Sequence, residues 1–74
     1  MFQEFEDVVL VVDLPDYGLQ VGDVGAIVDI DKTGRQVTLE IFSMTGRTIA
    51  VVPVAVEAVR SVGNNEIAHM RVLS

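Results

Sequence analysis

Residues 29–40 carry the pattern in this chain that comes closest to a metal-binding motif. Its first, third and twelfth positions are carboxylates (Asp29, Asp31 and Glu40), its fifth is a hydroxyl residue and its sixth is glycine, which is the ligand spacing of a calcium-binding EF-hand loop. Such a loop needs a helix on each side, whereas both flanks here alternate apolar and polar residues as strands do. The sequence therefore predicts a plain hairpin turn around Gly34 and no bound calcium.

No other group of residues supplies the parts of a catalytic or metal site. His69 is the single histidine and the chain has no cysteine, so a transition-metal site lacks its usual ligands. The serines have no base nearby in the sequence, and Asp13 and Asp16 flank Pro15, where acidic residues commonly form turns. We therefore predict no enzyme activity, no catalytic residue, no metal ligand and no cofactor, and we expect His69 at a surface or interface.

The net charge of −6 is unevenly distributed along the chain. Residues 1–31 contain eight of the eleven acidic residues and no Lys or Arg, whereas residues 32–74 contain all five basic residues and three acidic ones. An acidic surface repels phosphate backbones, which disfavours nucleic acid as a partner, and it suits a basic protein partner. A solvated surface that keeps the chain soluble is the simpler interpretation.

The beginning of the chain also bears on location. Acidic residues stand where a secretory signal would be basic, and the apolar run 8–12 is too short to cross a membrane. The absence of cysteine fits a reducing compartment. The expectation is a soluble, cytoplasmic protein with no membrane partner.

Half of the residues are hydrophobic, and valine is the commonest type, which favours strands. Turn residues separate five β-prone runs, at about residues 7–13, 24–31, 35–43, 47–52 and 58–62. In the second run the apolar face is expected to be Val24, Ala26, Val28 and Ile30, with Gly25 at a bend or a close backbone approach. In the third run the inward residues are expected to be Val37, Leu39 and Ile41.

The fourth run is expected to point Ile49 and Val51 inward and to end at Pro53, which cannot donate to a strand ladder. Residues 54–57 then read as one 3₁₀ turn before the last strand. Phe2 and Phe5 are expected to cover one end of the core.

This pattern predicts an all-β fold, a small five-stranded SH3-like barrel over residues 1–63, with a small open sandwich as the alternative. Residues 64–74 are expected to form a C-terminal arm or an extra edge strand, because Ala68, Met70 and Val72 alternate with Ile67, His69 and Arg71.

Several segments resemble a small bacterial family known only as domain-of-unknown-function family 4926. The segments are Asp7-Val-Val-Leu, Asp13-Leu-Pro-Asp-Tyr-Gly-Leu, Gly22-Asp-Val-Gly-Ala-Ile-Val and Gly46-Arg-Thr-Ile-Ala-Val-Val. The final Glu66-Ile-Ala-His-Met-Arg is similar to a tail that often follows this domain. The resemblance implies an SH3-like barrel in a bacterial cytoplasmic protein with no assigned catalytic residues, and it is compatible with an antitoxin or immunity role.

A small barrel cannot bury so many valines, and surplus apolar surface usually marks a protein interface. We therefore predict a non-catalytic protein–protein interaction module that forms a homo-oligomer or binds a basic protein. The expected contact residues are an apolar patch and an arm that reaches a neighbour: Val9, Val11 and Phe42, with Ile67, His69, Met70 and Arg71. The alternatives are an antitoxin or immunity protein that masks a basic toxin, and an RNA- or ribosome-associated barrel, which the charge opposes.

Overall fold

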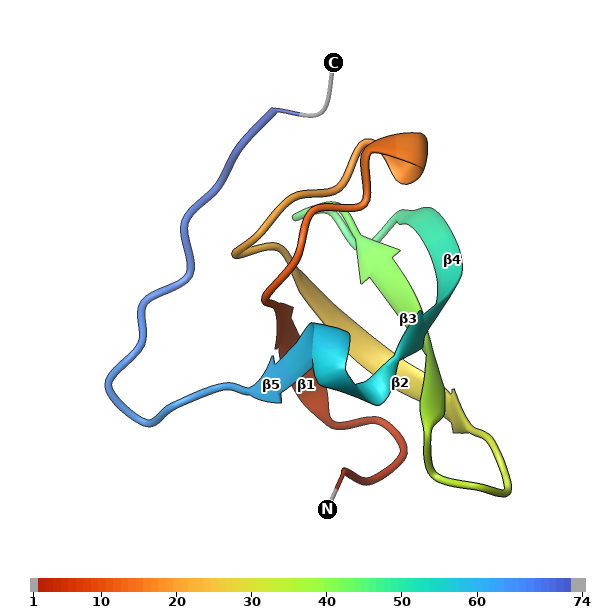
Figure 1. Cartoon of the computed structure of the whole chain (residues 1–74). Coiled ribbons are helices and arrows are strands. Elements are labelled where there is room, and N and C mark those ends of the chain that lie inside the picture. The colour runs from red at the N-terminus through yellow and green to blue at the C-terminus, as the bar shows by residue number, and fades with distance from the viewer. Residues whose placement is uncertain (1, 73–74) are drawn as a thin grey trace.

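The computed structural model describes residues 2–72, and within them the fold is all-β (Figure 1). The strands are β1 (Asp7–Leu10), β2 (Val24–Ile30), β3 (Gln36–Phe42), β4 (Thr48–Ala55) and β5 (Val59–Ser61), with two 3₁₀ turns, η1 (Pro15–Tyr17) and η2 (Val56–Ala58). The described residues contain no helix long and apolar enough to span a membrane. Five strands, the β2–β3 hairpin in place of an EF-hand, and a 3₁₀ turn before the last strand confirm the predicted fold class.

All strand pairs are antiparallel, and the five strands form one sheet in the order β4-β3-β2-β1-β5. The sheet curls on itself, as Figure 1 shows. The pairings in the described part of the chain do not join β4 to β5, so the closure expected of an SH3-like barrel stays a prediction.

The core lies inside the curl and takes alternate residues from each strand. One row crosses its centre: Leu39 of β3 pairs with Ile27 of β2 and Val52 of β4, and all three side chains are fully buried. Val37 and Ile41 of β3 are buried beside Leu39. The inward face predicted for the third strand is therefore confirmed.

The face predicted for the second strand is wrong for Val24, Ala26 and Val28 and correct for Ile30, because β2 contains a bulge between the two parts. Ile27 pairs with Leu39 but Asp29 pairs with Thr38, so Val28 has no partner in the ladder. An extra residue reverses the side-chain alternation beyond it. Before the bulge the core residue is Ile27, and after it Ile30 packs against the core.

The prediction for the fourth strand is also wrong. β4 continues through Pro53, which pairs with Thr38, and the 3₁₀ turn starts only at Val56. β4 lies at one edge of the sheet, so a residue without an N–H is tolerated where its nitrogen would face away from β3. Val51 is exposed, and Ile49 is the unpaired residue of a second bulge.

The N-terminal segment covers the core only in part. Phe2 packs against the core as expected, whereas Phe5 is 77% exposed and adopts a positive φ of 67°. The backbone N–H of Phe5 donates to the carbonyl of Ile27, and that of Ile27 donates to Glu6. Phe5 therefore attaches the N-terminal segment to β2 through its backbone and not through its side chain.

Candidate functional site

The C-terminal arm, residues 62–72, leaves β5 and runs up one side of the molecule, past the segment that joins β1 to β2 (Figure 1). Every residue of the arm is exposed, and none belongs to a strand. Within the described residues, its one hydrogen bond between backbone groups runs from the N–H of Glu66 to the carbonyl of Gly63. The described part of the C-terminal segment is thus an arm and not a sixth strand.

A bidentate ion pair holds the base of the arm. The Arg60 guanidinium donates to both Glu66 carboxylate oxygens, at 2.6 Å and 2.5 Å, and the N–H of Gly63 donates to Oε1 of the same carboxylate. These charge-assisted hydrogen bonds, Arg60 first, lower the pKa of Glu66 from 4.5 to about 2.

This ion pair gives a pH prediction. The pKa of Glu66 is depressed in the folded chain. The ion pair therefore stabilises the arm fully above pH 4.5, and this stabilisation is lost as the pH falls toward 2. A carboxyl-detected NMR titration of the wild type should place the Glu66 midpoint near 2. In the control variant Arg60→Gln the midpoint should return toward 4.5, and an unchanged midpoint there would contradict the assignment.

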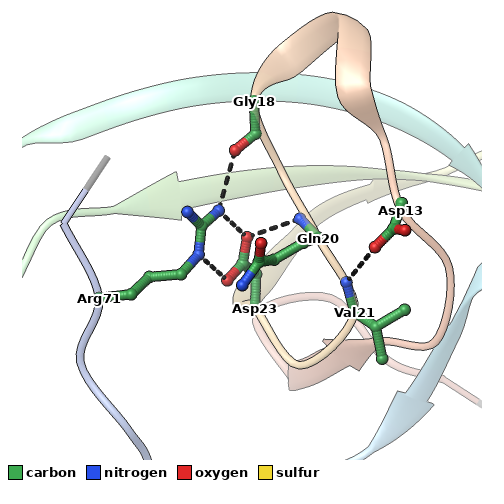
Figure 2. A network of polar contacts seen from close by, with 6 residues as sticks. All are labelled: Asp13, Gly18, Gln20, Val21, Asp23 and Arg71. Atoms are coloured by element: carbon green, nitrogen blue, oxygen red, sulfur yellow. Dashed lines mark hydrogen bonds and ion pairs between the residues drawn. The ribbon is translucent and has the colours of Figure 1, made fainter. Parts of the chain in front are cut away.

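A second ion pair holds the far end of the arm (Figure 2). Arg71 donates through Nε to Oδ1 of Asp23 at 2.7 Å and through NH2 to Oδ2 at 2.5 Å, and NH2 also donates to the carbonyl of Gly18 at 2.9 Å. The Asp23 side chain is only 15% exposed. The hydrogen bonds from the Arg71 guanidinium are the main reason that the pKa of Asp23 lies below its usual value.

The segment that receives Arg71, residues 13–23, is braced by its own contacts. Oδ1 of Asp13 accepts the N–H of Val21 at 2.9 Å, and Leu14 bridges Leu19 through paired backbone bonds. Gly18 takes the left-handed conformation that ends η1. Asp13 therefore acts as a turn former, as its position beside Pro15 predicts, and the braced loop positions both acceptors of Arg71.

A groove of about 600 Å³ lies between the arm and the body of the protein. Its wall on the body comes from the 13–23 loop and from the ends of β2, β3 and β4, and the apolar part of that wall is Leu19, Val24, Ile41, Phe42, Met44 and Ile49. Its other wall is the arm, residues 68–72. We call this feature the arm groove.

The structure brings together only some of the residues predicted for an interaction site. Phe42, His69, Met70 and Arg71 all line the arm groove. Ile67 is 82% exposed on the arm but does not line the groove.

The expected patch of Val9, Val11 and Phe42 needs a correction. Val9 faces away from Val8 and Leu10, as a strand residue between two core residues must, but it is only 7% exposed. Val9 pairs with Val24 on one side and Arg60 on the other, and it offers no free surface. Val11 is 40% exposed and lies beyond the end of β1.

The sequence interpretation missed the outer face of β4. Val51, Pro53 and Ala55 alternate with the buried Val52 and Val54, so these three point outward and are exposed. Residues 48–56 contain no charged side chain. Pro53 was the available signal, because a proline inside an apolar run is typical of an edge strand.

The arm groove and the outer face of β4 offer apolar contact surface, and ion pairs hold the two ends of the arm beside the groove. Within residues 2–72 the structure gathers no group of three His, Cys, Asp or Glu side chains that could hold a metal ion. Asp31 of the EF-hand-like stretch instead caps its hairpin, where its carboxylate accepts the Thr33 hydroxyl and the N–H groups of Arg35 and Gln36.

Comparison with known proteins gives a family but no described relative. No curated protein and no solved structure matched the chain. Residues 4–61, which include all five strands, match the family model described as "Domain of unknown function (DUF4926)", and the arm lies outside the matched region. Because this match covers more than half of the chain, the protein belongs to the DUF4926 family.

Proposed function

We propose that this protein is a non-catalytic interaction module that associates with a second copy of itself. The observation that supports this proposal is the uncharged, exposed outer face of the edge strand β4, which continues into the arm groove through Ile49. Exposed apolar surface that adjoins a hollow is typical of protein contact sites.

The edge of β4 adds a backbone argument. Natural edge strands are commonly protected by charged side chains, by proline or by bulges. β4 has Pro53 and the bulge at Ile49, but no charge between them. Val51 is 56% exposed. The stretch around it therefore combines the backbone of an edge strand with an apolar surface.

A substitution on β4 tests the proposal by light scattering after size exclusion. Val51→Lys puts a charge on the proposed contact, where it would have to lose its hydration, and should raise the dimer dissociation constant by about tenfold or more. The matched control is Phe5→Lys, because Phe5 is 77% exposed but belongs neither to β4, nor to the 13–23 loop, nor to the lining of the arm groove.

The control should dimerise like the wild type. Equal association of both variants would remove β4 from the contact. A wild type that stays monomeric at all concentrations would refute self-association and leave the basic-partner hypothesis to be tested.

A further inference from the structure

We propose that two copies of this chain exchange their C-terminal arms, so that Arg71 of each copy pairs with Asp23 of the other. This inference rests on the proposed self-association and names the segment that carries it. The contact involved is the Arg71–Asp23–Gly18 network that the single chain already shows (Figure 2).

The first argument is the poor burial of the arm on its own body. Met70 and Val72 are 77% and 89% exposed although they line the arm groove, which has an apolar wall, and Ile67 is 82% exposed outside the groove. Packed on its own chain, the arm gains almost no hydrophobic stabilisation. In a dimer, the second copy can cover both the exposed apolar side chains of the arm and the apolar wall of the groove.

The second argument is that the contact can be transferred. Among residues 67–72, hydrogen bonds to the rest of the described chain, residues 2–66, come from Arg71 alone, and they go to the 13–23 loop. The base of the segment is fixed separately by Glu66 and Arg60. Residues 67–72 can therefore move to a neighbouring copy without breaking a strand pairing, and exchange of an identical element is a low-cost route to a dimer.

The third argument is charge complementarity. Residues 67–72 contain one positive charge, Arg71, and no acid, whereas residues 13–23 contain three acids and no base. The attraction between these segments is the same whether they belong to one chain or two. Two-fold symmetry would then form the contact twice.

Charge reversal distinguishes exchange from a strap that stays on its own chain. In Asp23→Arg the loop repels the arm, and in Arg71→Asp the arm repels the loop, so each variant alone should dimerise about tenfold more weakly than the wild type or worse. When the two variants are mixed, the wild-type arm of the first meets the wild-type loop of the second. The Asp at position 71 of the second variant also meets the Arg at position 23 of the first, so this pair again has opposite charges.

The mixture should therefore form a heterodimer of near wild-type affinity by light scattering. The double variant Asp23→Arg/Arg71→Asp should dimerise with itself and serves as the positive control. If the wild type dimerises but the mixture does not recover, the arms do not exchange and another surface, such as β4, carries the association. If the wild type is monomeric, the proposed self-association fails as well.

A second measurement covers the case in which Asp23→Arg does not fold. The chain has no native cysteine, so the exposed position Val72→Cys can carry a single photo-crosslinker. This variant is mixed with ¹⁵N-labelled wild type and illuminated. Cross-links from residue 72 to heavy peptides of the 13–23 loop support exchange, whereas cross-links to light peptides of the same molecule alone contradict it.

Discussion

Leu39→Ala is expected to lower the free energy of unfolding by about 2–5 kcal/mol, which is the usual cost of removing a large aliphatic side chain from a close-packed core. Leu39 is fully buried at the centre of β3, between Ile27 and Val52, which are fully buried too. These neighbours sit on paired strands and cannot collapse into the cavity without disturbing two ladders. A domain of this size has only a few kcal/mol to lose, so a large part of the variant should be unfolded.

Urea unfolding followed by circular dichroism measures this loss. The control is Thr38→Ala, because Thr38 is the preceding residue of the same strand, points to the opposite face and is only half-buried. Its midpoint should stay much closer to that of the wild type. Equal losses in the two variants would contradict the assignment of the core face.

Gly25→Ala is expected to destabilise the fold by about 1–3 kcal/mol through overpacking. A Cβ at this position would lie 2.7 Å from Cδ1 of Ile41 and 3.2 Å from the carbonyl oxygen of Glu40. Gly25 does not have a positive φ, so the cost comes from contact with β3 and not from backbone strain. The sequence prediction of a close approach at Gly25 is thereby confirmed.

A double-mutant cycle isolates the clash. Ile41→Val removes the Cδ1 methyl and should cost about 0.5–1.5 kcal/mol by itself. The double variant Gly25→Ala/Ile41→Val should lose less than the sum of the two single losses, because the second change makes room for the first. Additive losses would show that the Ile41 side chain is not the obstacle.

The parts of the fold that the sequence predicted are those governed by local alternation and turn chemistry. The β2–β3 hairpin follows from strand patterns on both sides of Gly34, and its turn is capped by Asp31, which stands at the third position of the EF-hand-like spacing. The inward face of β3 follows from strict alternation, which no bulge interrupts between Val37 and Ile41.

The errors arise where alternation is broken. A bulge adds one residue to one strand, and nothing in the composition of β2 or β4 distinguishes Val28 or Ile49 from their paired neighbours. Whether Pro53 ends the ladder depends on the position of its strand in the sheet, which local sequence does not reveal. On an edge strand the missing N–H faces outward, and the ladder continues.

The candidate site was predictable only in outline. The arm and the contribution of Phe42 could be inferred from surplus apolar residues, but the pairing of Arg71 with Asp23 spans 48 positions of the sequence. Only the fold shows that these residues meet. The burial of Val9 has the same origin, because its flanking partners Val24 and Arg60 come from other strands.

The most direct test of the account is sedimentation equilibrium of the unmodified protein over a wide range of concentrations at neutral pH. Self-association through the exposed apolar surface predicts a mass that rises from the 8.0 kDa of one chain toward twice that value. A mass that stays at 8.0 kDa up to the highest concentration would contradict the account.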